Sequence, residues 1–287
     1  MTAYICLSAG ALLLLLAVTD FLCTTISLGG LGPVSSRVTT PLWRIGRATT
    51  LFAERRFGVS MRGAIGPTVL SALGATWILL HLAAYTLLYL AGSSLVSSET
   101  GAPATLVQIV AFAGSALSTL GASTVQPTNG WWDILSMVAA VNGMVVLTLS
   151  VSFVLNIIQT TTSARQWAVR YNAAKRVSDQ DMEEVLAQLG PELCRIVVDL
   201  TASPLTGVFV PDDPEMSFPK AIHDLIEELE RRALIPLPSS KQGPEPAHLV
   251  LGIELLGRHA LGARTDTDLD AARAWAMDHA LHVQVGK

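Results

Sequence analysis

The stretch Ser118-Thr119-Leu120-Gly121-Ala122-Ser123-Thr124 lies between two long apolar segments of the chain. A shorter apolar run, Thr105 to Leu117, comes directly before it, and Pro127 and the tryptophan pair Trp131 and Trp132 follow. On its own, such a stretch is either a glycine turn in an outer loop or a segment that dips into a membrane. The surrounding sequence favours the second interpretation.

The composition is that of a membrane protein. Of the 287 residues, 51% are hydrophobic and 15% are charged, and the mean hydropathy is +0.47. Soluble domains carry about 25% charged residues. The charges are also segregated, because residues Gly63 to Ala164 include no lysine or arginine and only two acids, Glu99 and Asp133. This pattern predicts a membrane block followed by a water-soluble tail.

Three segments are long enough to cross a bilayer, which takes about 20 apolar residues. They run from Tyr4 to Ile26, from Thr68 to Ala91 and from Ile134 to Ile158. The Thr105–Leu117 run is too short to cross and fits a re-entrant helix. A cleaved signal peptide would begin with positive charge, whereas the first basic residue here is Arg37. We therefore expect the first span to be an uncleaved anchor.

The distribution of basic residues predicts the orientation, because cytoplasmic loops are enriched in lysine and arginine. The connection from Leu31 to Arg62 holds six arginines against the single acid Glu54, and four basic residues follow the third span. Both regions should be cytoplasmic, with the N-terminus outside, in a multi-pass protein of the plasma membrane. Trp43 and Trp167 should then lie near the inner interface.

Within the basic connection, a face formed by Leu42, Ile45, Thr49 and Phe52 predicts an amphipathic helix that begins at Pro41. Such a helix would lie on the inner leaflet, with its arginines near anionic lipid headgroups. The alternative is a solvated basic linker.

The opening stretch has a simple electrostatic interpretation if the run before it is a re-entrant helix. The C-terminus of that helix carries roughly −0.5 of an elementary charge and favours a cation beyond it. The chain must then return outward through Thr119 to Ser123 without regular structure, which membranes tolerate only where the backbone lines water or is buried in protein. The carbonyls of such a segment can replace the water shell of an ion.

This arrangement resembles the two-helix pore module of the potassium-channel superfamily, over roughly Thr68 to Gln159. Thr119-Leu120-Gly121 fits the family's Thr-Val-Gly, while Ala122 stands in place of its tyrosine and Ser123 in place of its second glycine. Gly143 falls at the usual offset of the inner-helix hinge glycine. The resemblance implies a homotetramer that conducts monovalent cations.

The departures from the family pattern change the expected activity. Ala122 cannot brace a filter as tyrosine does, and Ser123 adopts a left-handed backbone only with strain. We therefore expect a cation channel with an atypical, weakly selective filter at Thr119, Leu120, Gly121, Ala122 and Ser123. The alternative is a non-conducting, channel-like membrane scaffold or sensor. The sequence shows no catalytic set, so we do not expect an enzyme.

The third span carries a polar stripe in its cytoplasmic half. Ser152, Asn156 and Gln159 recur at spacings of four and three residues, so they share one helical face. Polar side chains within a span usually face a bundle interior or water. We expect these three to line the inner pore and its gate; the alternative is hydrogen bonding between helices. For Asp20 and His81, inside the first and second spans, we favour structural roles over conduction or proton sensing.

The overall prediction is an all-α membrane protein with four parts. Residues 1–30 form an N-terminal transmembrane helix and 31–62 the basic connection. Residues 63–160 form the pore module, with three spans in all plus a re-entrant pore helix, and 161–287 a helical cytosolic domain. We expect no metal site, cofactor or nucleic-acid partner. The expected partners are membrane lipids and other copies of the same chain.

The cytosolic helices are predicted from caps and apolar spacing. Ser178 caps a helix that ends at Gly190, and an amphipathic stripe runs along Ile222, Leu225, Ile226, Leu229 and Ala233. Two further helices are expected at His248–Leu261 and Asp268–His282, after a flexible link at Pro236–Pro246. His279 and His282 share a helical face and are interpreted as a solvated surface pair rather than a metal site.

Overall fold

The computed structural model describes residues 2–26, 30–92, 94–121, 124–176, 179–232, 244–259 and 267–280. About 82% of the structure is helical. The chain forms two compact units, each built from two stretches of sequence. The first comprises Met1–Thr40 and Leu70–Val154, and the second comprises Pro41–Val69 and Leu155–Lys287.

Three helices are long and apolar enough to cross a membrane, as the sequence predicts. They are α1 (Thr2–Thr25), α3 (Arg62–Leu90) and α5 (Gly130–Ala174). The last is longer than the predicted span because the helix continues without interruption beyond Ile158 to Ala174. The protein is therefore a helical membrane protein with three candidate spans.

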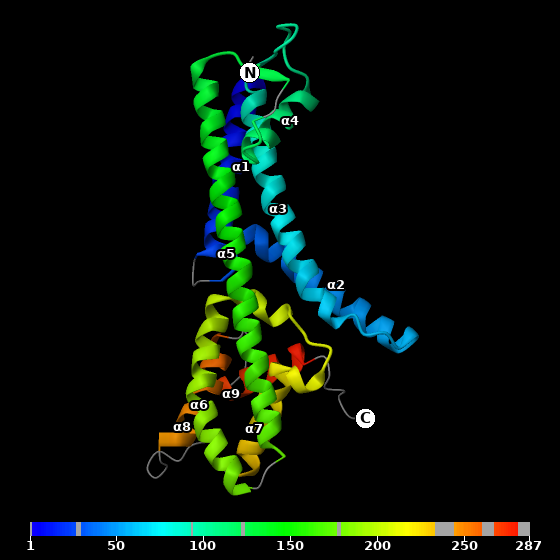
Figure 1. Cartoon of the computed structure of the whole chain (residues 1–287), viewed down its shortest axis with the longest axis vertical. Coiled ribbons are helices and arrows are strands. Elements are labelled where there is room, and N and C mark those ends of the chain that lie inside the picture. The colour runs from blue at the N-terminus through cyan, green and yellow to red at the C-terminus, as the bar shows by residue number, and fades with distance from the viewer. Residues whose placement is uncertain are drawn as a thin grey trace. The chain divides into compact units, whose positions relative to one another are not determined.

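In the first unit, these three helices lie side by side and are joined through aromatic contacts (Figure 1). The Phe21 ring of α1 meets the Trp77 ring of α3 edge-on at 4.9 Å, and Trp77 reaches Phe153 of α5 at 5.9 Å. A Cβ at Gly10 of α1 would stand 2.9 Å from the backbone nitrogen of Leu88. Small residues of this kind let transmembrane helices approach closely.

Asp20, which is fully buried in α1, caps the next helix, α2 (Pro33–Phe57). Its Oδ1 accepts hydrogen bonds from the backbone N–H groups of Val34 (2.6 Å) and Ser35 (3.0 Å). Its Oδ2 accepts from the Ser35 hydroxyl (2.6 Å) and from the Trp77 indole (3.3 Å). The expected structural role is thus confirmed, and no arginine in the described part of the chain forms an ion pair with Asp20.

The predicted helix start at Pro41 is wrong, because α2 begins eight residues earlier and Pro41 lies inside it. Pro33 occupies the first helical position, where its missing N–H costs nothing, and Asp20 satisfies the N–H groups that follow. A cap contributed by a side chain from another helix leaves no local sequence signal.

In the second unit, only part of the predicted amphipathic face of α2 is covered by protein. Leu42 and Trp43 pack against a cluster formed by Ile65, Val69, Val208 and Val210. Ile45, Thr49 and Phe52 are exposed. Their contact with lipid stays a prediction.

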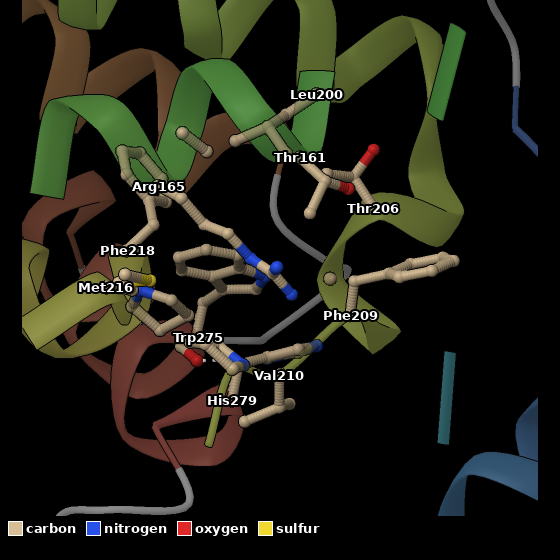
Figure 2. A pocket seen from close by; sticks show the side chains of 14 residues that line it. Thr161, Arg165, Leu200, Thr206, Phe209, Val210, Met216, Phe218, Trp275 and His279 are labelled. Carbon is tan, nitrogen blue, oxygen red and sulfur yellow. Dashed lines mark hydrogen bonds between the residues drawn. The ribbon is translucent and has the colours of Figure 1, made fainter. Parts of the chain in front are cut away.

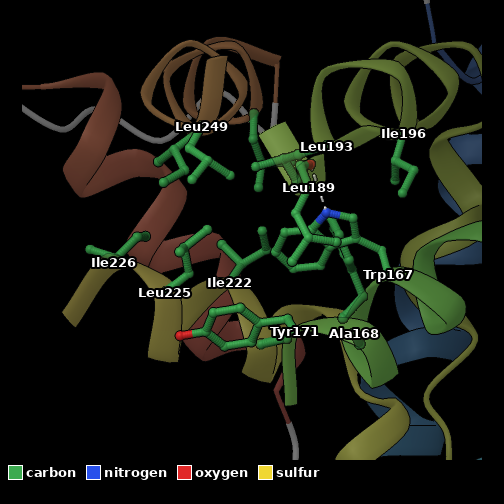
Figure 3. Close-up of a cluster of buried hydrophobic side chains, with 14 of the residues drawn as sticks. Trp167, Ala168, Tyr171, Leu189, Leu193, Ile196, Ile222, Leu225, Ile226 and Leu249 are labelled. Atoms are coloured by element: carbon green, nitrogen blue, oxygen red, sulfur yellow. Dashed lines mark hydrogen bonds between the residues drawn. The ribbon is translucent and has the colours of Figure 1, made fainter. Parts of the chain in front are cut away.

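The second unit has a large apolar core between the end of α5 and four further helices. These are α6 (Asp179–Ala202), α7 (Phe218–Arg231), α8 (Pro244–His259) and α9 (Asp268–His279), with the short 3-10 turns η1 (Pro204–Val208) and η2 (Pro214–Met216) before α7. Figure 3 shows Trp167 and Tyr171 of α5 surrounded by leucines and isoleucines of α6 and α7. The placement of Trp167 at a membrane interface is therefore wrong, because its side chain is fully buried and its indole donates to the Leu189 carbonyl (3.1 Å).

The predicted helices of the tail are present with changed ends. The α7 stripe is confirmed, since Ile222, Leu225, Ile226 and Leu229 are all buried. Helix α6 does not end at Gly190 but continues through Pro191 to Ala202. Gly190 packs closely against α8, since a Cβ atom at this position would lie 2.9 Å from the Cβ atom of His248. Ser178, Ala233 and His282 lie outside the described residues, as does the predicted link up to residue 243.

The interpretation of His279 as a solvated surface residue is wrong. Its side chain is 13% exposed, and its ring stacks on Trp43 at 5.7 Å and on Trp275 at 5.0 Å. Its Nδ1 donates to the Trp275 carbonyl (3.0 Å). Burial lowers the pKa of His279, and the nearby positive charge of Arg47 lowers it further. The hydrogen bond to Trp275 and the negative charge of Asp278 act in the opposite direction and are outweighed.

We predict that the second unit loses stability in mild acid through His279. The unfolded chain binds a proton near pH 6.5, whereas the folded pKa of His279 lies lower, so stability present above pH 6.5 is lost as the pH falls below it. The slope is at most about 1.4 kcal/mol per pH unit. Thermal unfolding of the full chain at pH 7.5 to 5.5 should show this slope, and His279→Gln should flatten it. His248→Gln, at an exposed histidine, is the control; an equal slope in both variants would contradict the prediction.

Candidate functional site

The loop that contains the opening stretch is closed at its base by a small antiparallel sheet. Strand β1 (Leu95–Ser97) precedes the loop, and strand β2 (Val125–Pro127) follows it. Leu95 pairs with Pro127 and Ser97 with Val125. Because the two strands pair directly, the chain from residue 98 to residue 124 returns to the place that it left.

Inside this loop lies the helix α4 (Leu106–Leu117), which matches the predicted run. Its N-terminus is fixed by a capping box: the Gln108 N–H donates to the Thr105 hydroxyl, and the Gln108 side chain accepts from the Thr105 N–H (2.9 Å). A capping box satisfies two N–H groups that a helix leaves without partners. Ile109, Phe112 and Ala113 are buried in one apolar cluster with residues of α3, where the Phe112 ring meets that of Tyr89 edge-on at 5.1 Å.

The end of α4 explains the backbone at Thr119. The N–H groups of Thr119 and Leu120 donate to the carbonyls of Ala116 and Ser115, both at 3.0 Å. This is the Schellman arrangement, which requires a left-handed residue after the cap and usually takes glycine there. The chain has Thr119 at that position, with φ at 57°. A left-handed threonine costs roughly 1–2 kcal/mol, so the site holds backbone strain.

The residues after the helix are open to their surroundings. Thr119, Leu120 and Gly121 are exposed, with Leu120 at 72%, and Gly121 also has a positive φ, 71°. An open pocket with about 720 Å³ of empty space lies beside them, lined among others by Thr119, Gly121 and Asp133. Ala122 and Ser123, the two residues that depart most from the channel pattern, lie outside the described residues.

Gly143 of α5 lies directly against the end of α4. A Cβ at this position would overlap the carbonyl oxygen of Leu117, which is backbone and cannot move aside as a flexible side chain would. Helix α5 runs through Gly143 without interruption. The structure thus shows a close-packing role for this glycine, and its role as a hinge stays a prediction.

The three predicted pore-lining residues are all exposed on α5. The Ser152 hydroxyl donates to the Thr148 carbonyl of its own helix (3.1 Å). The Asn156 amide donates to the hydroxyl of Ser203 (2.7 Å), a fully buried residue just after α6. Gln159 is exposed. Asn156 therefore contacts the residue that follows α6 in the second unit, a partner that the periodicity of one helix could not reveal.

Among the residues that the structure describes, no group of three or more histidines, cysteines or acids could hold a metal ion. Cys6, Cys23 and Cys194 are free. His81 of α3 is buried, and its Nδ1 lies 2.8 Å from the Trp77 carbonyl, which is the contact expected of a packing histidine.

No protein-family model matches the chain, and no solved structure matches it. Over 211 residues the chain is 25% identical to the uncharacterized membrane protein YdjJ of Bacillus subtilis (strain 168). The alignment covers 69% of this chain and 60% of that relative, so the chain spans about three fifths of the relative's length. This similarity agrees with the membrane character of the three candidate spans.

Proposed function

We propose that the chain is one subunit of a homotetrameric, weakly selective cation channel in the plasma membrane. The observation that carries the proposal is the β1–β2 pairing around α4. A helix of 12 residues is too short to cross a bilayer, and the paired strands return the chain to the side from which it came. Such a path is the one expected of a re-entrant pore loop.

The charges and surfaces near this loop support the same function. The C-terminus of α4 points its partial negative charge at the loop, and Asp133 lines the adjoining pocket. One loop per chain cannot enclose an ion path, so closed cyclic symmetry must supply the rest. The exposed side chains along α5, such as Met137, Val141 and Ser152, provide surface for neighbouring subunits, lipid and the inner pore.

One observation favours the alternative, a non-conducting membrane scaffold. The Ser118 carbonyl accepts a hydrogen bond from the adjacent Thr119 hydroxyl (2.7 Å), so in this conformation part of the acceptor capacity of that carbonyl is already used within the loop.

Single-channel recording of the purified chain in planar bilayers tests the proposal. We expect a reversal potential near zero under a potassium/sodium gradient and a shift toward the cation potential under a potassium chloride gradient. Thr119→Val, which removes the hydroxyl at similar size, and Thr119→Gly, which also removes the strain, should each change the conductance severalfold. The control Thr19→Val alters a hydroxyl that bonds only within α1.

The possible results separate the hypotheses. Strong potassium preference would overturn the weak selectivity. Currents that both Thr119 variants leave unchanged would place the ion path elsewhere. Silence at all voltages from an intact tetramer would support the scaffold.

A further inference from the structure

Helix α2 has one face that protein covers, in the part of it that belongs to the second unit, residues 41–57. On this face the Trp43 ring stacks on the His279 ring of α9 at 5.7 Å. Figure 2 shows His279 beside Trp275 and Val210, which complete the surroundings of this contact. The covered face is therefore occupied by the tail of the chain itself.

The opposite face of α2 is exposed and apolar. Ile45, Ala48 and Phe52 recur at spacings of three and four residues, so they form one stripe, and all three are exposed. The stripe continues into the turn before α3, where the Phe57 ring meets the Phe52 ring edge-on at 6.4 Å. The large apolar side chains that are more than half exposed here are Ile45, Phe52, Phe57, Val59 and Met61. An exposed apolar stripe of this kind marks an interaction site.

Three exposed arginines border the stripe. At 100° per residue, Arg44 and Arg55 lie along one edge of it and Arg56 along the other. None of the three forms a hydrogen bond or an ion pair with a residue that the structure describes, whereas Arg62 pairs with Glu54. Glu54 is the one acid between residues 33 and 61. The stripe therefore carries uncompensated positive charge on both edges.

This surface differs from the face that the sequence predicts. Leu42 was expected on the exposed side but packs against the cluster around Ile65 and Val69. The hydroxyl of Thr49 donates to the Ile45 carbonyl of its own helix (2.9 Å). The exposed apolar surface is instead centred on Phe52 and extends beyond the end of the helix, a continuation that the spacing within one helix could not reveal.

The combination of an apolar stripe and arginine edges fits the surface of an anionic bilayer. The apolar side chains can enter the boundary of the acyl chains while the arginines extend to lipid phosphates. A soluble acidic partner would match the charges but not the aromatic rings. Only four residues, 58–61, separate α2 from the candidate span α3, which keeps the turn close to a helix expected to enter the membrane.

We propose that this face of α2 and the turn after it dock on a membrane leaflet that contains anionic lipid. The apolar stripe from Ile45 to Met61 is inserted below the headgroups, and Arg44, Arg55 and Arg56 bind the phosphates of anionic lipids. The proposal does not depend on whether the chain conducts ions.

Nitroxide labels on the full chain in lipid nanodiscs test the proposal. Single cysteines replace Ile45, Phe52 or the control residue Val198 in a chain whose three native cysteines are changed to serine. Val198 of α6 is as exposed as Ile45, at 58%. Collision rates are measured with oxygen, which concentrates in lipid, and with a nickel chelate, which stays in water. The discs contain phosphatidylcholine alone or with one quarter phosphatidylglycerol.

We expect the oxygen-to-nickel ratio in anionic discs to be severalfold higher at positions 45 and 52 than at position 198. At positions 45 and 52 it should fall in neutral discs, because the arginines then have no anionic lipid to bind. Changing Arg44, Arg55 and Arg56 together to glutamine should remove the difference between the two lipids.

A matched control removes the same number of charges from arginines of the second unit that pair with acids. These are Arg170, Arg176 and Arg258. Their change to glutamine should leave the lipid dependence of the Phe52→Cys label unaltered.

Labels at positions 45 and 52 that stay in water in both kinds of disc would overturn the proposal. If soluble polyglutamate then protected them, the occupant would be an acidic protein; magnetic broadening between labels would assign the face to a second copy of the chain. Equal ratios in neutral and anionic discs would overturn the choice of an anionic lipid. No readout requires a current, so these outcomes are independent of the channel recordings.

Discussion

Replacing Asp20 with alanine is expected to lower the stability of the first unit by about 2–4 kcal/mol, the largest effect of any single polar side chain in its spans. The carboxylate accepts four hydrogen bonds, two from the first turn of α2 and two from the side chains of Ser35 and Trp77. The two backbone N–H groups and the Ser35 hydroxyl lose this partner together, while the Trp77 indole keeps its contact with the Ser35 hydroxyl (3.2 Å). Because Asp20 is fully buried, water cannot replace it without opening the packing between α1, α2 and α3.

A conservative variant separates the loss of the cap from the loss of volume. Asp20→Asn keeps the size of the side chain, but its amide nitrogen cannot accept the bonds now made by one carboxylate oxygen. We expect it to lose about half as much stability as alanine, since one oxygen still accepts the two backbone N–H groups.

The measurement is thermal unfolding of the purified chain in detergent, with Thr19→Ala as the matched control. Thr19 is the adjacent residue in α1, and its hydroxyl is exposed and bonds only to carbonyls of its own helix. Its replacement should change the unfolding midpoint little. If Asp20→Ala unfolds at the same temperature as Thr19→Ala, then Asp20 does not hold α2 in place.

The three candidate spans could be predicted from the sequence because their signal is local. A bilayer requires about 20 consecutive apolar residues, and three stretches of the chain meet that condition. The short helix α4 was predictable for the same reason, since its apolar run is bounded by the capping threonine Thr105. The stripe of α7 also follows from spacing alone.

Features that depend on contacts between distant residues could not be predicted in this way. The start of α2 is set by a carboxylate 13 residues before Pro33, on another helix. Trp167 belongs to the buried core of the second unit, and hydropathy does not distinguish that environment from a membrane interface. The strands β1 and β2 have three residues each, too few for alternation to stand out. Asn156 was selected by its spacing, but its partner Ser203 lies 47 residues away.

The second large effect is expected at Gly143, where alanine should lower the stability of the first unit by about 2–3 kcal/mol. In an unobstructed helix, changing glycine to alanine gains up to about 1 kcal/mol, because it restricts the unfolded chain and favours the helix. At Gly143 the new methyl group would overlap the Leu117 carbonyl oxygen. Either α5 moves away from α4 or the Schellman turn at Thr119 is displaced.

Gly74 provides a matched control for the same chemical change. It lies within α3 in the same unit, and a Cβ at that position would have no atom within 4 Å. Gly74→Ala should therefore leave the thermal midpoint unchanged or raise it slightly. A midpoint for Gly143→Ala as high as that of Gly74→Ala would show that the α4–α5 contact is not close enough to require glycine.

The pair of variants also separates packing from gating in the proposed channel. If Gly143 acts only as a hinge, alanine should stiffen α5, keep the thermal midpoint and change the fraction of time that the channel is open. If Gly143 is needed for the contact with Leu117, stability and conductance should fall together, because the carbonyl that is pushed aside lies two residues before Thr119. We expect the second result, since the clash involves backbone on the α4 side and side-chain rearrangement cannot relieve it.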